Sequence, residues 1–315
     1  MKELVVVAIG GNSIIKDNAS QSIEHQAEAV KAVADTVLEM LASDYDIVLT
    51  HGNGPQVGLD LRRAEIAHER EGLPLTPLAN CVADTQGGIG YLIQQALNNR
   101  LARHGEKKAV TVVTQVEVDK NDPGFAHPTK PIGAFMSKEE AEKMAREKGW
   151  HIAEDAGRGW RQVVASPKPL AVVELTTIRA LAEADNVVIA CGGGGIPVIA
   201  TDHHHLKGAA AVIDKDLASE LLAEHLDADM LIILTAVEKV AVNFNKPNQK
   251  WLDTLTPEEA RTYIGEGQFA PGSMLPKVEA AVKFAESKPG RTALITLLEK
   301  ARDGIDGKTG TRIAC

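Results

Sequence analysis

Three glycine clusters, each directly after an apolar run, expose backbone that can bind an anion. They are Gly10-Gly11-Asn12, HGNGPQ (51–56) and CGGGGIP (191–197). Glycine lets backbone N–H groups approach a phosphate closely, and the start of a helix adds a favourable dipole. Each cluster by itself can also be read as a tight turn between a strand and a helix. Three of them at the ends of parallel strands would share the edge of the sheet where ligands bind.

The positive charge for such a site must come from elsewhere in the chain, because no lysine follows Gly10-Gly11 and Ala8 stands two positions before them. AVIDKDLAS (211–219) places Asp214, Lys215 and Asp216 between apolar residues, so some of these charges can point into a cleft. Lys277 follows a proline at the opening of a predicted helix, where a cation is mildly unfavourable unless an anion lies nearby. These residues indicate phosphate chemistry at a site assembled from separate segments.

Two standard nucleotide-binding signatures do not fit. The GxGxxG dinucleotide pattern would need a glycine at Pro197. DGKTGT (306–311) contains the end of a Walker A motif, but Arg302 stands where that motif has its first glycine. We interpret the second segment as a polar turn.

The potential metal ligands of the sequence do not form a recognisable site. The three cysteines, Cys81, Cys191 and Cys315, lack the spacing of a disulfide framework or a zinc site. The consecutive His203–His205 favour a solvated loop, because three adjacent residues cannot all face one ion in regular structure. We therefore predict no metal site made by protein side chains alone.

Length and composition limit the possible classes. A chain of 315 residues with 44% hydrophobic content can bury a large core, as one domain or as two lobes that share a sheet. Neither a membrane-spanning stretch nor a signal-peptide pattern is seen, so we expect a cytoplasmic protein without a membrane partner. The net charge of −9 argues against nucleic-acid binding, although lysines clustered in a cleft can still bind anionic substrates.

Apolar runs alternate with helical patterns along the chain. Buried strands are predicted at 4–9, 45–50, 109–114, 186–191, 229–235 and 292–298. Helices are predicted near 20–43, 56–71, 83–104, 171–184, 208–226 and 276–287. This alternation predicts an α/β fold, a three-layer αβα sandwich with a mainly parallel open sheet.

The segment 119–169 interrupts this alternation. It is rich in proline, glycine and charge, and shows one helix pattern at 137–149, where Ser137 and Glu140 form a capping box. We see no strand of a sheet in it. Because a plain loop of this length is unusual, we predict a small inserted subdomain that protrudes over the edge of the active site.

Most of the chain resembles one known enzyme family. The similar blocks are AIGGN, THGNGPQVG, TQVEVDKNDPGFAHPTKPIG, EDAGRGWRQVVASPKP, CGGGGIPVI, AVIDKDLAS, DMLIILTAVEKVAVNF and GSMLPKVEAA, in order from residue 8 to about 281. They resemble the signature blocks of carbamate kinases, members of the amino acid kinase family. The inserted PTKPIG and EDAGRGWR segments together with IDKD distinguish carbamate kinases from other amino acid kinases.

The resemblance implies reversible phosphoryl transfer between ATP and carbamate, giving ADP and carbamoyl phosphate, with Mg²⁺ as cofactor and a homodimer as the assembly. It implies one amino acid kinase domain over 1–315. Within it, 1–205 would be a lobe for carbamate and the phosphoryl group, 119–169 the inserted subdomain, and 206–315 the nucleotide-binding lobe.

The resemblance also implies roles for individual residues. Gly10, Gly11, Asn12, Gly52 and Asn53 match the loops that hold the phosphoryl group and carbamate. Lys215 and Lys277 match the lysines that neutralise the phosphates, Asp216 the aspartate that positions them, and Lys130 a lysine that the subdomain brings over the substrate. Asp214, Thr235, Val237, Met274 and Leu275 are expected along the nucleotide.

Two alternatives remain open at this point. Another amino acid kinase, one that phosphorylates a carboxylate, would typically carry a lysine where this chain has Ala8 and would lack the PTKPIG insert. A catalytically silent binding protein on the same scaffold would tend to lose its charged site residues, which are all present here. The chain also departs from the family at Asp84 and Gly88, in a region expected to contribute to the dimer contact.

Overall fold

A central eight-stranded sheet organises the part of the chain that the computed structural model describes, which is every residue except 1, 12–13, 16–17, 103–106, 156 and 203–204. In spatial order its strands are β15 (Thr254–Leu255), β17 (Thr311–Ile313), β16 (Thr292–Leu297), β12 (Met230–Thr235), β1 (Glu3–Ile9), β2 (Tyr45–His51), β9 (Val187–Ile189) and β3 (Ala109–Thr111). The strands from β16 to β3 run parallel, and β17 is antiparallel to β16. The six predicted apolar runs correspond to these parallel strands.

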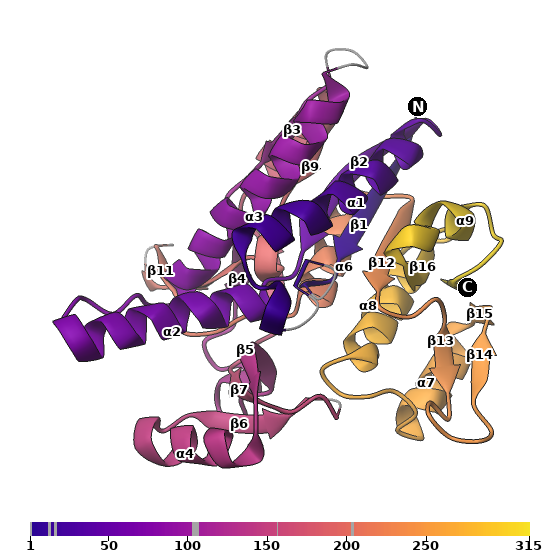
Figure 1. Cartoon of the computed structure of the whole chain (residues 1–315). Helices are drawn as coiled ribbons and strands as arrows, with labels where there is room; N and C mark the ends of the chain where they lie inside the picture. The colour runs from indigo at the N-terminus through magenta and orange to yellow at the C-terminus, as the bar shows by residue number, and fades with distance from the viewer. Residues whose placement is uncertain (1, 12–13, 16–17, 103–106, 156, 203–204) are drawn as a thin grey trace.

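Helices cover both faces of this sheet (Figure 1). One layer contains α1 (Ile23–Leu41), α3 (Leu78–Leu101) and α9 (Ala301–Ile305), and the other contains α5 (Leu175–Glu183), α6 (Lys215–His225) and α8 (Met274–Ser287). In β1, Val5 and Val7 belong to the core beneath α1 and α3, whereas Val6 and Ala8 belong to the core beneath α6. Both faces of the strand are therefore apolar, and the predicted three-layer sandwich is confirmed. Within the described ranges, every helix is too short or too polar to span a bilayer.

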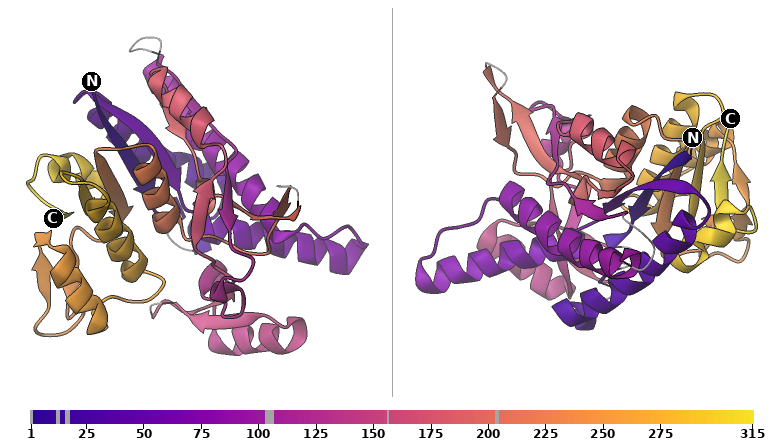
Figure 2. Two further views of the ribbon diagram at one scale, coloured as in Figure 1. Left: turned by 180° about the vertical axis from the view of Figure 1, so that it is seen from behind. Right: turned by 90° about the horizontal axis from the view of Figure 1, so that it is seen from above.

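The remaining elements lie beside the central sheet (Figure 2). A four-stranded sheet contains β11 (Leu206–Gly208), β10 (Ile196–Ala200), β4 (Gln115–Val118) and β8 (Pro169–Val172), and β13 (Val240–Val242) forms a hairpin with β14 (Lys250–Leu252). Two further helices are α2 (Gly54–Glu71) and α7 (Pro257–Gly265), and short 3-10 turns span Asn18–Ser20, Pro123–Phe125, Gly192–Gly194 and Leu298–Lys300.

The helix predicted from residue 208 begins only at Lys215. The Asp214 side chain accepts a hydrogen bond from the backbone N of Asp216 at 2.8 Å and thereby caps the helix. The residues before it are outside the helix, and Val212 and Ile213 are fully buried. Apolar residues in this stretch therefore resemble a helix pattern without forming one.

The expectation that segment 119–169 lacks strands of a sheet is wrong. It contains β5 (Lys130–Met136), β6 (His151–Glu154) and β7 (Trp160–Val164), which form an antiparallel sheet in the order β5-β7-β6, and α4 (Lys138–Lys148). Most side chains of β5 are half-buried and the strand includes a proline and a glycine, so it lacks the apolar run of a central strand. The capping box of Ser137 and Glu140 is confirmed. This unit, here called the inserted sheet, lies beyond the ends of the central strands (Figure 1).

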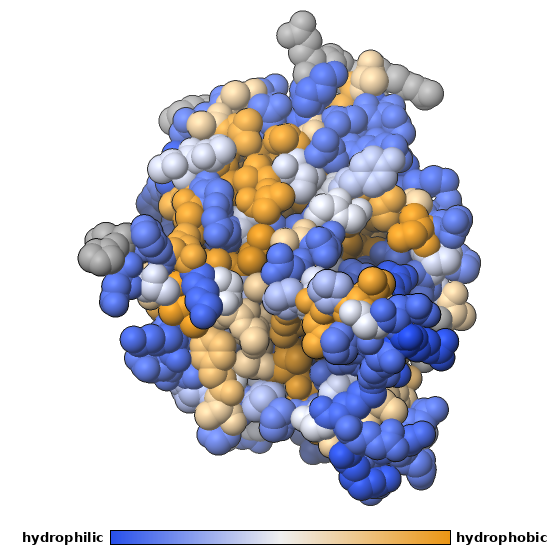
Figure 3. Space-filling model, turned by 90° about the vertical axis from the view of Figure 1, so that its left-hand side faces the viewer, coloured by the Kyte–Doolittle hydropathy of each residue, from blue (hydrophilic) through white to orange (hydrophobic). Residues whose placement is uncertain are grey.

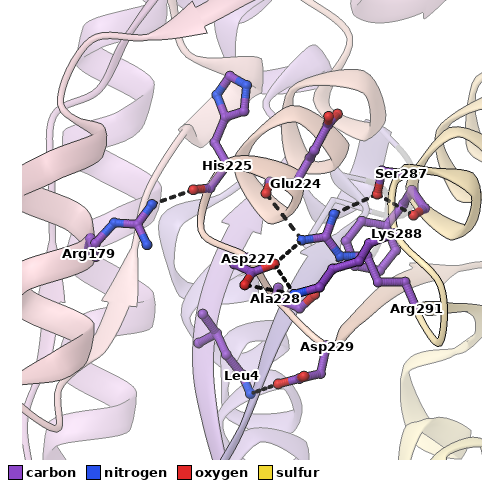
Figure 4. Close-up of polar contacts among 11 residues, drawn as sticks. Leu4, Arg179, Glu224, His225, Asp227, Ala228, Asp229, Ser287, Lys288 and Arg291 are labelled. Atoms are coloured by element: carbon purple, nitrogen blue, oxygen red, sulfur yellow. Dashed lines mark hydrogen bonds and ion pairs between the residues drawn. The ribbon is translucent and has the colours of Figure 1, made fainter.

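A polar cluster ties α6 and α8 together at the ends that lie away from the glycine turns (Figure 4). The guanidinium of Arg291, which is only 6% exposed, donates to the carbonyl oxygen of Ala228 at 3.1 Å, to Ser287 Oγ at 2.6 Å and to Asp227 Oδ1 at 2.6 Å. The backbone N of Leu4 donates to the carboxylate of Asp229 at 2.8 Å. These bonds hold β1 and both helices in fixed relative positions.

Candidate active site

A cavity of about 640 Å³ opens at the carboxyl ends of the parallel strands. Gly10 follows β1, Gly52 follows β2, and Thr235 ends β12, and all three line the cavity. The other predicted site residues that line it are Gly11, Asn53, Lys130, Asp214, Lys215, Asp216 and Lys277. The structure thus brings together residues from both halves of the chain and from the inserted sheet, as the parallel-strand geometry predicts.

Two aspartates bind the three predicted lysines of the cavity. Lys130 Nζ lies 2.6 Å from Asp214 Oδ2. Lys277 Nζ lies 2.8 Å from Asp216 Oδ2, and the other oxygen of Asp216 is paired with Lys215 Nζ. Three ammonium groups therefore face two carboxylates, which leaves this charged group with a net positive charge.

Asp216 explains the unfavourable position of Lys277 at the start of α8. Asp216 lies in the first turn of α6, where a carboxylate is stabilised by the helix dipole. Its side chain is almost fully buried and accepts hydrogen bonds from both Lys215 and Lys277. The anion required near Lys277 is therefore supplied by the protein itself.

Burial and pairing shift the ionisation of these groups in different directions. Burial lowers the pKa of Lys215 to about 8, although Asp216 opposes the shift. Burial also disfavours the charge of Lys277, but Asp216 and Asp214 outweigh it and the pKa of Lys277 is raised. The two lysines hold the pKa of Asp216 below its usual range in spite of burial. At neutral pH all three groups are mostly charged.

The first two glycine turns pack directly against each other. A Cβ atom on Gly52 would lie 2.9 Å from the backbone N of Gly11 and 3.2 Å from Lys215 Cδ. The backbone N of Gly52 donates to the carbonyl oxygen of Ile9 at 2.9 Å. Glycine is required at Gly52 because any side chain would separate the turns and displace the lysine.

The third glycine cluster supports the second. The Asn53 side chain is buried and donates to Thr85 Oγ1 at 2.9 Å. A Cβ on Gly193, whose φ is +67°, would lie 2.2 Å from Asn53 Nδ2. Gly193 also lines the cavity, so this cluster both borders the site and leaves room for the asparagine.

Sequence reasoning assigned no role to three charged residues that line the cavity from the inserted sheet. Arg161 Nη1 lies 3.0 Å from Asp155 Oδ2, and Arg158 Nη2 lies 3.1 Å from Asp155 Oδ1. The sequence did contain a signal for these residues, because all three belong to the EDAGRGWR block that resembles a carbamate kinase signature. Only the structure shows that this block folds back toward the lysines.

Some predicted residues lie away from the described cavity lining. Val237 lies in the bend after β12, and Met274 and Leu275 lie in the first turn of α8 against the core. Their contact with a nucleotide stays a prediction. Asn12 falls outside the described residues, as do two members of the histidine run, His203 and His204.

The residues present fit a divalent cation only as a companion of bound phosphates. Among the described residues, no group of three or more histidine, cysteine or acidic side chains is arranged to hold a metal. The carboxylates in the middle of the cavity, Asp214 and Asp216, are already paired with lysines. Phosphate oxygens would have to supply most of the ligands, as is usual for Mg²⁺.

Comparison with known proteins shows the family to which the chain belongs. The model of the amino acid kinase family matches residues 3–296. The chain is 68% identical to the carbamate kinase-like protein YahI of Escherichia coli K12 over 99% of both chains. It is 51% identical to the carbamate kinase of Clostridium perfringens, over 98% of this chain and 99% of that protein.

Solved structures show the same likeness. The carbamate kinase from Giardia lamblia bound to citric acid superposes with a TM-score of 0.93 at 40% identity, over 99% of this chain and 98% of that chain. The same enzyme bound to AMP-PNP gives a TM-score of 0.87 at 41% identity, with the same coverage. With its arrangement of glycine turns, paired lysines and inserted sheet, the chain belongs to the carbamate kinases of the amino acid kinase family.

Proposed function

We propose that this protein catalyses reversible phosphoryl transfer between ATP and carbamate, giving ADP and carbamoyl phosphate. The observation that carries the proposal is the set of three lysines and two aspartates at the glycine turns. An anionic acceptor must approach a polyphosphate, and two unit charges 4 Å apart repel by about 4 kcal/mol at an effective dielectric constant near 20. A helix N-terminus offsets only about 0.3–1 kcal/mol of this at an exposed site. The lysines must therefore supply most of the compensation.

The chemistry needs no general base, because carbamate already presents an anionic oxygen. Catalysis then consists of positioning and electrostatic stabilisation of the transferred group. We assign Lys215 and Lys277 to the phosphate oxygens and Asp216 to holding both lysines in place. The backbone of Gly10, Gly11 and Gly52 would receive the transferred group.

Lys130 reaches the same site from the inserted sheet. Its ion pair with Asp214 joins that sheet to the start of α6. We propose that Lys130 contacts carbamoyl phosphate and that the inserted sheet covers the substrate. The arginines beside it, Arg158 and Arg161, add positive charge on the same side.

The nucleotide is expected beside β12 and α8, where Thr235 and Ser273 line the cavity. The relative from Giardia lamblia bound to AMP-PNP supports an adenine nucleotide as the second substrate. Mg²⁺ would neutralise charge on the nucleotide phosphates when bound. We leave the lobe boundary at 205 and the limits 119–169 as predictions.

The direct test supplies purified protein with ADP, Mg²⁺ and carbamoyl phosphate and measures ATP. We expect ATP formation that depends on the protein and is abolished in Lys277→Ala. No ATP above the uncatalysed background would overturn the proposal. Acetyl phosphate in place of carbamoyl phosphate tests the alternative of a carboxylate kinase, which would make ATP from the acetyl compound instead.

We further propose a homodimer. Figure 3 shows apolar areas on the side of the molecule where Figure 1 draws α2 and β11. Leu73 and Leu75 follow α2, Leu206 begins β11, and all three side chains are exposed. Extended apolar patches on a soluble protein commonly mark interaction surfaces. Asp84 and Gly88 lie exposed on α3, beside a second hollow of about 190 Å³. Sedimentation equilibrium would show twice the chain mass, and a monomer at micromolar concentration would contradict the proposal.

A cytoplasmic location is our expectation. The reaction can form ATP from carbamoyl phosphate released by breakdown of a ureido compound such as arginine or allantoin, or it can run toward carbamoyl phosphate. Measuring the equilibrium position under cellular ATP and ADP concentrations would distinguish the two directions.

A further inference from the structure

Two glycines of α2 let the inserted sheet approach the helix at backbone distance. Gly54 and Gly58 lie four residues apart, so they share one face of the helix. A Cβ on Gly58 would lie 2.1 Å from the backbone N of Gly133 in β5. A Cβ on Gly54 would lie 3.3 Å from the carbonyl oxygen of Pro131. The two elements therefore meet with no side chain between them at these positions.

Gly58 lies inside α2, about one turn after its start, where glycine weakens a helix relative to alanine. Its presence needs a reason, and the contact with Gly133 supplies one. Gly87 in the interior of α3 differs: it is exposed, and an added Cβ there would meet nothing within 4 Å. Gly58 is thus a packing position, whereas Gly87 tolerates a methyl group.

Arg161, in the neighbouring strand β7, stabilises the contact between α2 and β5. Its Nε donates to the carbonyl oxygen of Gly133 at 3.1 Å, and its guanidinium is buried. Arg161 Nη2 would lie 3.6 Å from a Cβ on Gly54. The strand β5 is therefore held between the α2 backbone and this arginine.

The contact is close to the lysine that the inserted sheet contributes. Lys130 begins β5, three residues before Gly133. A strand advances about 3.3 Å per residue, so Lys130 lies about 10 Å along the chain from the glycine contact. A displacement of β5 at Gly133 would be transmitted to Lys130 through this short stretch of strand.

We propose that the contact between Gly58 and Gly133 fixes the position of the inserted sheet over the cavity, which makes Gly58 a positioning residue for Lys130. This inference rests on the proposed function. A side chain at position 58 has no space to enter, because the atoms it would meet are backbone atoms of β5. It would push β5 away from α2 and withdraw Lys130 from Asp214 and from the substrate.

The test compares Gly58→Ala with Gly87→Ala. Both place alanine inside a helix, but only the first creates a clash. We expect Gly58→Ala to lower kcat/KM for carbamoyl phosphate by roughly 10- to 100-fold, since a misplacement of about 1 Å can cost about 100-fold. Gly87→Ala should retain wild-type kinetics. Equal activity of the two variants would overturn the proposal.

A double-variant cycle separates positioning from general damage. In a Lys130→Ala background, Gly58→Ala should have little further effect, because the group that it displaces is already absent. An undiminished effect in that background would overturn the proposal. If Gly58→Ala does not fold, Gly54→Ala provides a milder displacement of the same strand, and the same dependence on Lys130 is required.

Hydrogen exchange provides a readout that does not depend on activity. Backbone amides of 130–136 should exchange faster in Gly58→Ala than in Gly87→Ala, while those of β1 and β2 stay unchanged. Unchanged exchange in β5 would overturn the positioning role even in an active enzyme. If the wild-type protein forms no ATP while Gly58→Ala still shows the faster exchange in β5, only the proposed function is contradicted.

Discussion

Substitution of Asp216 by asparagine tests the central electrostatic argument, because it keeps the shape of the side chain and removes its charge. Asp216 is 2% exposed, and one of its oxygens lies 2.8 Å from Lys277 Nζ. At an effective dielectric constant of about 20, that contact has a Coulomb energy of roughly 6 kcal/mol. Part of this offsets the desolvation of the charges, and breaking a buried pair from one side typically costs about 3–5 kcal/mol.

The same substitution changes the ionisation of Lys215. Burial already lowers its pKa to about 8, and Asp216 is the main group that keeps the pKa from falling further. If Lys215 acts as a cation, kcat/KM of the wild-type enzyme must decrease as the pH rises through about 8. In Asp216→Asn the pKa of Lys215 is lower still, so this decrease begins at lower pH. In the wild-type enzyme Lys277 has a raised pKa and does not contribute in this range.

The assay measures initial rates of ATP formation from carbamoyl phosphate and ADP between pH 6 and 10. We expect kcat/KM of Asp216→Asn to be lower by roughly 100- to 1000-fold at pH 8, the range seen when one aimed electrostatic contact is lost. Asp253→Asn is the matched control, because Asp253 pairs with Lys239 at the surface and does not line the cavity. Near-wild-type activity of Asp216→Asn, or a loss of activity with the alkaline decrease still at pH 8, would refute the reasoning.

Three further predictions concern separate parts of the molecule. Lys130→Ala should raise KM for carbamoyl phosphate more than KM for ADP. Steady-state kinetics in which both KM values change by the same factor would contradict its position over the acceptor. Burial raises the pKa of Glu220 to about 7 from the usual 4.5, so its contribution to stability is present below pH 4.5 and is lost by about pH 7. Urea titration should show that Glu220→Gln removes about 3 kcal/mol of this pH dependence, whereas Glu224→Gln retains most of it, because Glu224 raises the pKa of Glu220 less than burial does. Arg291→Ala should lower the free energy of unfolding by about 1–3 kcal/mol, because it leaves the buried carbonyl oxygen of Ala228 without its hydrogen-bond donor; calorimetry that finds no loss would refute the stabilising role of the polar cluster around Arg291.

The central sheet could be predicted from the sequence because its strands are buried on both faces. A strand such as β1, with Val5 and Val6 in different cores, must be apolar throughout and is therefore visible as a run. The strands of the inserted sheet are half-buried and antiparallel. Nothing in local composition separates them from a loop, and only their pairing with each other defines them.

The charged residues of the site could be predicted because they stand at positions in the sequence where a charge is unusual. Lys277 near a helix start and three charges among apolar residues at 214–216 both indicated a partner not seen in the local sequence. The identity of that partner required the structure, since Asp216 and Lys277 lie 61 positions apart. Gly58 gave no signal of its own, because the strand it contacts was not expected.

The position of β1 at the middle of the sheet has a consequence for synthesis of the chain. Its first neighbour, β2, follows soon after it, but its other neighbour, β12, begins only at Met230. At a synthesis rate of about 5–20 residues per second, one edge of this largely apolar strand is without its partner for roughly 11–44 s, the time needed to extend the chain from Ile9 to Met230. Such an open edge can pair with other chains. The nascent N-terminal half therefore carries this open edge until β12 is synthesised, before the residues that complete the active site have been made.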